Sequence, residues 1–362
     1  FKITCKSFSL NIFSSMIKFI KRHIPIDIKM SLKLLKNDLI NFKKNDDEII
    51  KVEQPLVLIS QLQRSGGTLL NSLFDGHDEC HVYPGELMWG NPKKWNFPND
   101  SLLSYTNKKI FMELIKNKFS RYQMFATKGY HKGKLASKKD SIEFKYNYHF
   151  HKKLFKLILD SFESLSIRNV LNTYLTSFFN SWLNYQGLYG SKKYVVAFTP
   201  RTIMIEKSVK DFFYAYPDGF IISIIREPGG WWSSAKKHGS GYKEMGVQLG
   251  SELWKKSAKE AYDAKKRNPE RVILISFEKL LLNPEYLMNK IYQTIGISSV
   301  SDSQIVPTFN QNFVHSDSSY LSTKKKVDLN PIDRYKKTLP KEELEVIKNY
   351  QKFYEEISND FL

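Results

Sequence analysis

Residues 56–70 read LVLISQLQRSGGTLL and contain the signals of a strand, a loop and a helix in succession. Its first five residues form a continuous apolar run, which is typical of a strand buried on both faces of a parallel sheet. A glycine-containing loop follows, and residues 69–74 have the pattern of a helix. Backbone N–H groups at such a helix start can bind an anion, and Gly66 and Gly67 permit its close approach. The stretch predicts a phosphate-binding loop, with an ordinary glycine turn before a core helix as the alternative.

The predicted loop lacks the lysine of an ATP-binding loop, whose pattern is Gly-x-x-x-x-Gly-Lys-Ser/Thr. When Thr68 is aligned with the last position, Gly67 stands in place of the lysine and Gln61 in place of the first glycine. The cation of the loop is instead Arg64. A shorter cradle with one cation suits a single 5′-phosphate and its leaving oxygen.

The rest of the chain alternates strand and helix patterns. Further apolar runs predict strands at residues 80–83, 195–198, 220–225 and 271–276. Helical patterns occur at about 202–216, 231–238, 246–267, 284–295 and 340–358. This alternation predicts an α/β fold, a three-layer sandwich of the P-loop NTPase type with a central parallel sheet and helical insertions. We expect residues 1–50 to be a basic N-terminal extension and 51–362 one domain, with a helical, aromatic-rich insert at about 100–190.

A second anion site is predicted at the end of the most apolar strand. Arg226 follows that strand, and ligands of open parallel sheets bind beyond the carboxyl ends of the strands. Ser234 comes eight residues later, in a Pro- and Gly-containing turn that leads into a helix. An arginine can grip a phosphate with two N–H groups while a serine hydroxyl adds a further bond. A surface salt bridge is the alternative for Arg226 alone, but its pairing with a phosphate loop favours an anion site.

Together these motifs resemble the sulfotransferases that use 3′-phosphoadenosine 5′-phosphosulfate (PAPS), in particular their bacterial and tyrosylprotein-sulfotransferase-like branch. Residues 63–70 are similar to the 5′-phosphosulfate loop of that family, and Ile225-Arg226-Glu227-Pro228 with Ser234 is similar to its 3′-phosphate motif. Further similar segments lie at residues 75–77, 84–86, 216–220, 276–280, 283–285, 334–337 and 339. The resemblance spans about 55–358 but leaves 1–50 and 100–190 uncovered.

The resemblance implies in-line attack of an acceptor hydroxyl or amine on the sulfur of PAPS, with 3′,5′-ADP as product and no metal. It implies Glu86, which follows the second strand, as the base, and Arg64 at the bridging oxygen. A second cation is expected after the third strand. Phe198 would stand in its place in one register, whereas the gapless register puts Arg201 there, 25 residues before Arg226.

The implied nucleotide-binding residues come from both motifs: Arg64, Ser65, Gly66, Gly67, Thr68, Leu69, Arg226 and Ser234. Trp232 and residues 318–326 are candidates for contact with adenine, and a charged surface loop is the alternative for the latter. Family members of the small-molecule branch use a histidine base, but no histidine stands near Arg201. We expect His131, His149 and His151 to be surface residues.

The amino-acid composition limits the kinds of binding partner and the cellular compartment that we expect. The formal net charge is +19, which indicates either a polyanionic partner or a lysine-rich codon bias. Two cysteines far apart in sequence form neither a disulfide framework nor a metal-ligand pattern. The apolar run at residues 8–20 is too short to span a bilayer, so we expect no transmembrane anchor and a cytoplasmic location, or a peripheral one at a membrane.

Three functions compete at this stage. PAPS-dependent sulfuryl transfer to an unidentified acceptor, with a glycan among the candidates, explains both anion sites. An ATP-dependent P-loop kinase would need the missing Gly-Lys-Thr. A non-catalytic polyanion-binding protein would need only the basic surface, and no nucleic-acid partner is expected. The oligomeric state stays open.

Overall fold

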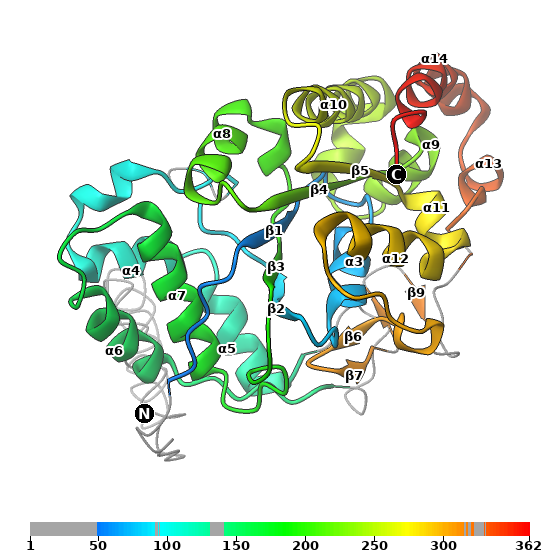
Figure 1. Cartoon of the computed structure of the whole chain (residues 1–362). Helices are drawn as coiled ribbons and strands as arrows, with labels where there is room; N and C mark the ends of the chain where they lie inside the picture. Colours follow the sequence, from blue (N-terminus) through cyan, green and yellow to red (C-terminus); the bar gives the residue numbers. More distant parts are fainter. Residues whose placement is uncertain are drawn as a thin grey trace, which may run out of the picture.

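The computed structural model describes residues 49–362, apart from 91–92, 94, 131–140, 315, 318–319, 322–328 and 330. Most of the predicted N-terminal extension therefore lies outside the described residues. Figure 1 shows the chain with its helices and strands labelled.

A five-stranded parallel sheet forms the centre of the described chain, in the order β2-β3-β1-β4-β5. Its strands are β1 (Leu56–Ile59), β2 (Cys80–Glu86), β3 (Tyr194–Phe198), β4 (Phe220–Ile225) and β5 (Val272–Ser276). The predicted strands are confirmed, and β2 runs three residues further than expected, to Glu86. The apolar runs predicted the sheet correctly because strands that are buried on both faces are continuously apolar and do not alternate between apolar and polar residues.

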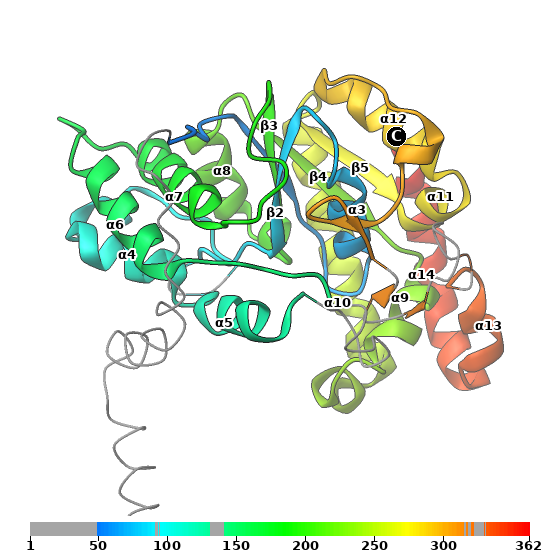
Figure 2. The same cartoon turned by 90° about the horizontal axis from the view of Figure 1, so that it is seen from below.

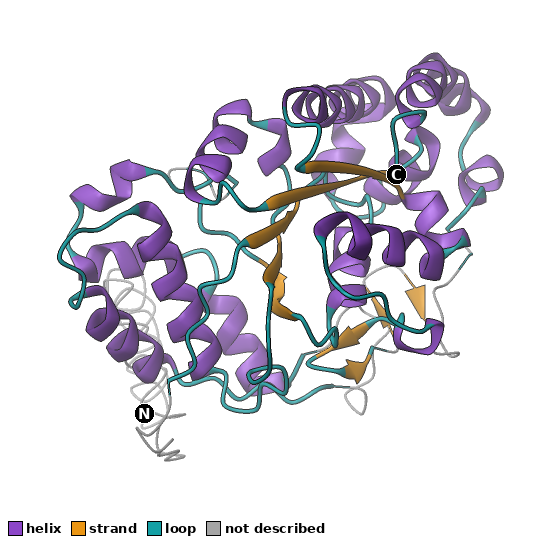
Figure 3. Cartoon of the chain, in the orientation of Figure 1, coloured by secondary structure: helices purple, strands orange, loops and turns teal. Residues whose placement is uncertain are grey.

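Helices cover both faces of the sheet, which confirms the predicted three-layer α/β fold (Figures 2 and 3). Leu56 and Leu58 of β1 pack in one apolar cluster with α7 (Ile167–Ser181), α8 (Glu206–Ala215) and α10 (Ser240–Arg267). Val57 and Ile59 pack in a second cluster with α3 (Gly67–Phe74), α11 (Phe277–Leu282) and α12 (Pro284–Ile295). Alternate residues of a strand point to opposite faces, so one apolar run supplies both clusters.

The segment between β2 and β3 is mainly helical in its described part. It contains the 3₁₀ helix η1 (Asp100–Ser104) and the helices α4 (Asn107–Ile115), α5 (Phe119–Lys128), α6 (Tyr148–Leu159) and α7. Aromatic side chains from α5 and α7, among them Tyr122, Tyr174 and Phe178, are fully buried. These aromatic side chains therefore form part of the hydrophobic core.

The remaining elements complete the carboxyl-terminal half. They are η3 (Thr202–Met204), α9 (Pro228–Ala235), η4 (Asp302–Gln304), β6 (Thr308–Phe309), β7 (Asn312–Phe313), β8 (Ser316–Asp317), β9 (Tyr320–Leu321), α13 (Arg334–Thr338) and α14 (Lys341–Ser358). Helix α10 is kinked at Gly246, where φ is 75°. Pro340 precedes α14 and does not start it, which shifts that predicted boundary by one residue. In the described part of the chain no helix is long and apolar enough to cross a membrane.

Candidate active site

The loop between β1 and α3 has glycine at two positions where a Cβ would collide with neighbouring side chains. Gly66 adopts φ 105°, and a Cβ there would lie 2.4 Å from a ring carbon of Phe277. A Cβ on Gly67 would lie 2.1 Å from the Gln61 amide nitrogen and 2.7 Å from the Phe198 ring. Gly66 caps α3 without a side chain, so the helix start presents backbone N–H groups at the carboxyl end of the central strand. The geometry is that of an anion cradle.

The two predicted anion motifs meet in space. Arg64 donates from Nε to Ser234 Oγ over 3.1 Å, although the residues are 170 positions apart. Arg226 donates from Nη1 to the Arg64 carbonyl oxygen over 3.4 Å. Trp231 of α9 ties the helix to the loop by donating from its indole to the Gln63 carbonyl over 2.9 Å. One site therefore contains both motifs.

Arg226 is a buried cation, with 6% of its surface exposed. Its guanidinium carbon lies 4.4 Å from the centre of the Phe277 ring, and the Trp254 indole donates a hydrogen bond to its carbonyl oxygen. Burial lowers the Arg226 pKa to about 10, against the opposing charge of Glu278, so the side chain stays protonated at neutral pH. Its buried Nε donates to no residue that the structure describes. A buried guanidinium with an unused donor suits a phosphate oxygen.

Arg201 follows β3 and contacts the same loop through Gln63. It adopts φ 65°, a region that costs a non-glycine residue about 1–3 kcal/mol. Its Nε donates to Gln63 Oε1 over 2.5 Å and its Nη2 to the Tyr242 hydroxyl over 3.0 Å. The Trp95 ring lies 4.8 Å from the guanidinium carbon. Gln63, Tyr242 and Trp95 are contacts that the sequence patterns did not indicate.

Glu86 is the last residue of β2 and follows Gly85, whose φ is 66°. Its carboxylate lies 3.9 Å from Arg121 Nη1 of α5, and about a quarter of the side chain is exposed. Arg121 belongs to the segment that the resemblance does not cover, so only the fold could bring this pair together.

Some further candidates are placed differently from the expectation. Trp232 is 2% exposed and its indole donates to Glu343 over 3.0 Å, so its ring is enclosed by protein. His151 is fully buried and bonded to the Tyr146 hydroxyl, which corrects the expectation of a surface residue. His149 is exposed as expected. His131 and the lysines at 324–326 lie outside the described residues.

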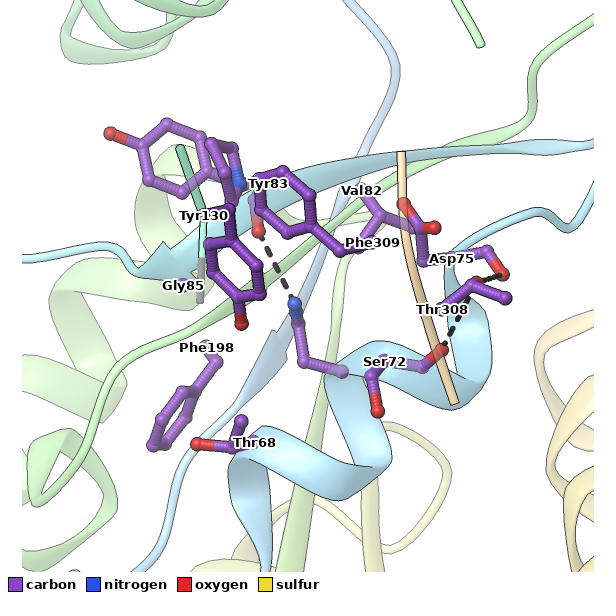
Figure 4. A pocket seen from close by; sticks show the side chains of 12 residues that line it. Thr68, Ser72, Asp75, Val82, Tyr83, Gly85, Tyr130, Phe198, Thr308 and Phe309 are labelled. Carbon is purple, nitrogen blue, oxygen red and sulfur yellow. Dashed lines mark hydrogen bonds between the residues drawn. The ribbon is translucent and has the colours of Figure 1, made fainter. Parts of the chain in front are cut away.

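A narrow pocket adjoins the loop (Figure 4). Thr68 and Phe198 lie at one end of it, and Asp75 and Thr308 at the other. Gly85, next to Glu86, also lines it. The pocket therefore touches both the anion cradle and the strand end that carries Glu86.

The sequence and the fold were compared with known protein families and solved structures. Residues 55–302 match the model of the sulfotransferase family. A sulfotransferase domain from the curacin biosynthetic pathway is 14% identical, with 83% of this chain and 98% of that chain covered and a TM-score of 0.48. A sulfotransferase domain from the Synechococcus PCC 7002 olefin synthase is 16% identical, with 86% and 98% covered and a TM-score of 0.43. No curated protein matches the sequence.

Proposed function

Because the chain belongs to the sulfotransferase family, we propose that it transfers a sulfuryl group from PAPS to a hydroxyl or amine of an acceptor and releases 3′,5′-ADP. One observation carries the proposal: the Arg64–Ser234 hydrogen bond joins a 5′-phosphate cradle to a second anion site at Arg226. Two phosphate sites held together suit a nucleotide that bears phosphates at both its 5′ and 3′ positions.

Different residues bind the two ends of the proposed nucleotide. The backbone of Ser65 to Thr68 and the N-terminus of α3, with Leu69 in its first turn, bind the 5′-phosphosulfate. Arg226 and Ser234 bind the 3′-phosphate, for which Arg226 supplies the buried Nε donor. Arg64 bonds to Ser234 and belongs to the cradle, so it lies between the two phosphates.

The proposed reaction is a single displacement. The acceptor oxygen bonds to sulfur while the bond from sulfur to the 5′-phosphate oxygen breaks, and the acceptor proton passes to the Glu86 carboxylate. Negative charge then develops on the released phosphate oxygen, where Arg64 and Arg201 stabilise it. Arg121 holds the Glu86 carboxylate in the free protein.

Ligand binding and group transfer test the proposal separately. We expect 3′,5′-ADP to bind at micromolar concentration or better, ATP to bind far more weakly, and radiolabelled sulfate to pass from PAPS to an acceptor extract. Tight ATP binding without 3′,5′-ADP binding would indicate a kinase. Polyanion binding that survives both Arg64→Ala and Arg226→Ala, without transfer, would indicate a non-catalytic binding protein.

A further inference from the structure

The pocket beside α3 lies where the proposed acceptor must approach. Thr68, at one end of the pocket, belongs to the anion cradle, and Gly85, which also lines it, precedes Glu86. Tyr130 and Phe309 form one wall, stacked with their ring centres 3.5 Å apart and their planes 8° apart. If an acceptor hydroxyl lies between the cradle and Glu86, the acceptor atoms next to that hydroxyl lie at this end of the pocket.

The pocket contrasts in charge with the rest of the molecule. The chain has 56 lysines and arginines, yet none of the described residues that line the pocket is basic. The one carboxylic acid among its described lining residues is Asp75, which is 8% exposed and accepts a hydrogen bond from the Gln311 N–H over 2.7 Å. An anionic group would lose its hydration there without gaining a partner cation, so the pocket favours an uncharged one.

Asn71 gives the pocket a hydrogen-bond acceptor. Its Nδ2 donates to the Tyr83 carbonyl over 3.2 Å, which leaves Oδ1 as the free end of the amide. Asn71 is 7% exposed, and its buried Oδ1 accepts a hydrogen bond from no residue that the structure describes. A buried carbonyl oxygen of this kind calls for a hydrogen-bond donor. Asn71 lines the pocket, so a ligand bound there is placed to supply that donor.

The volume of the pocket limits the size of the group that can donate this hydrogen bond. The cavity volume is about 10 Å³, which is the space that one water-sized group needs. Thr68 and Asn71 are three residues apart on α3, or about 4.5 Å along the helix axis. A hydroxyl on the carbon next to the reacting one, together with the hydrogen bond that it donates, spans such a distance, whereas a sugar ring cannot enter the cavity whole.

We infer that the acceptor is an uncharged vicinal diol: one hydroxyl is sulfated at the cradle, and its neighbour enters the pocket and donates a hydrogen bond to Asn71 Oδ1. This inference rests on the proposed sulfuryl transfer and names its substrate class. Sugars and glycerol derivatives share this chemistry. The reacting hydroxyl gives its proton to Glu86, so the bond to Asn71 requires the second hydroxyl.

The test uses acceptors that differ by a single hydroxyl. Transfer from PAPS is measured to 3-octyloxypropane-1,2-diol and to 3-octyloxypropan-1-ol, with octyl glucoside as the sugar source and glyceric acid as the anion. We expect kcat/KM for the diol or the glucoside to exceed that for the mono-alcohol roughly tenfold or more, and glyceric acid to be the poorest acceptor. The better of the diol and the glucoside identifies the source.

Variants separate recognition by Asn71 from its structural role. Asn71→Ala should reduce the diol-to-mono-alcohol ratio to about one, because only the diol uses Oδ1. Asn289→Ala removes a similarly bonded asparagine from α12 and should leave the ratio unchanged. A ratio near one in the unmodified protein, a ratio that survives Asn71→Ala, or a preference for glyceric acid overturns the inference.

The donor site is checked independently by 3′,5′-ADP binding. If 3′,5′-ADP binds but neither diol source is sulfated, the acceptor inference is wrong while the proposed donor site stands. If 3′,5′-ADP does not bind, the proposed function itself fails.

Discussion

Replacing Ser234 by alanine tests the junction of the two anion sites. Ser234 is 6% exposed, and its Oγ accepts the Arg64 Nε–H over 3.1 Å. The substitution removes the hydroxyl that accepts the Arg64 Nε–H and that is proposed to bind the 3′-phosphate. A hydrogen bond to a charged group contributes about 1.5–3 kcal/mol. Since about 1.4 kcal/mol is a factor of ten, we expect 3′,5′-ADP to bind roughly 10- to 150-fold more weakly.

Calorimetric titration of 3′,5′-ADP and 5′-AMP measures the effect. Because 5′-AMP has no 3′-phosphate, its affinity should fall much less, and the preference for the bisphosphate should shrink. Ser233→Ala is the matched control: Ser233 is also buried, but its hydroxyl pairs with Thr338 Oγ1 over 3.3 Å and should leave both affinities unchanged. Equal losses for the two nucleotides, or a folded Ser234→Ala protein that binds 3′,5′-ADP normally, would refute the two-phosphate site.

Three further predictions address the base, the loop and the core. Glu86→Gln should lower kcat by about 10²–10⁴ and leave 3′,5′-ADP affinity within about twofold, whereas a kcat within tenfold of normal would exclude Glu86 as the base. Gly66→Ala forces a Cβ to within 2.4 Å of Phe277 at φ 105° and should lower stability by about 1–3 kcal/mol together with nucleotide affinity; unchanged melting and binding would contradict this loop geometry. Burial lowers the His151 pKa from 6.5 to about 3, so the folded state loses stability as the pH falls below 6.5, by about 2 kcal/mol at pH 5. Denaturant unfolding of His151→Phe at pH 7 and pH 5 should show a pH difference smaller by that amount, and an equal difference would be evidence against a buried neutral histidine.

The sheet was predictable because its strands are continuous apolar runs between turn signals. Residues 56–59, 195–198, 221–225 and 272–276 are buried on both faces, so nearly all of them are apolar and the strands are visible in the sequence. The hairpins β6–β7 and β8–β9 were not predicted, since strands of two residues have no periodicity to detect.

The arginines of the site were predictable for a different reason. The chain has only nine arginines, so their positions carry more information than those of its many lysines. Arg64, Arg201 and Arg226 each follow a strand of one parallel sheet, and parallel strands bring their carboxyl ends to one edge. Arg121 follows no strand, and its contact with Glu86 depends on how α5 packs, which no local pattern encodes.

Helix α3 shows how much of the proposed acceptor pocket could be predicted from the sequence. Its leucines and Phe74 pack into the sheet, whereas Thr68, Asn71, Ser72 and Asp75 recur at the spacing of one helical face. A polar stripe on a helix otherwise buried in the core indicates either solvent or a pocket, and the sequence cannot distinguish them. What distinguishes them is the wall that Tyr130 and Phe309 build from elsewhere in the chain. That wall encloses the stripe and leaves the Asn71 carbonyl as a buried acceptor. The proposed acceptor pocket therefore depends on long-range packing, whereas the proposed donor nucleotide is indicated by two short motifs.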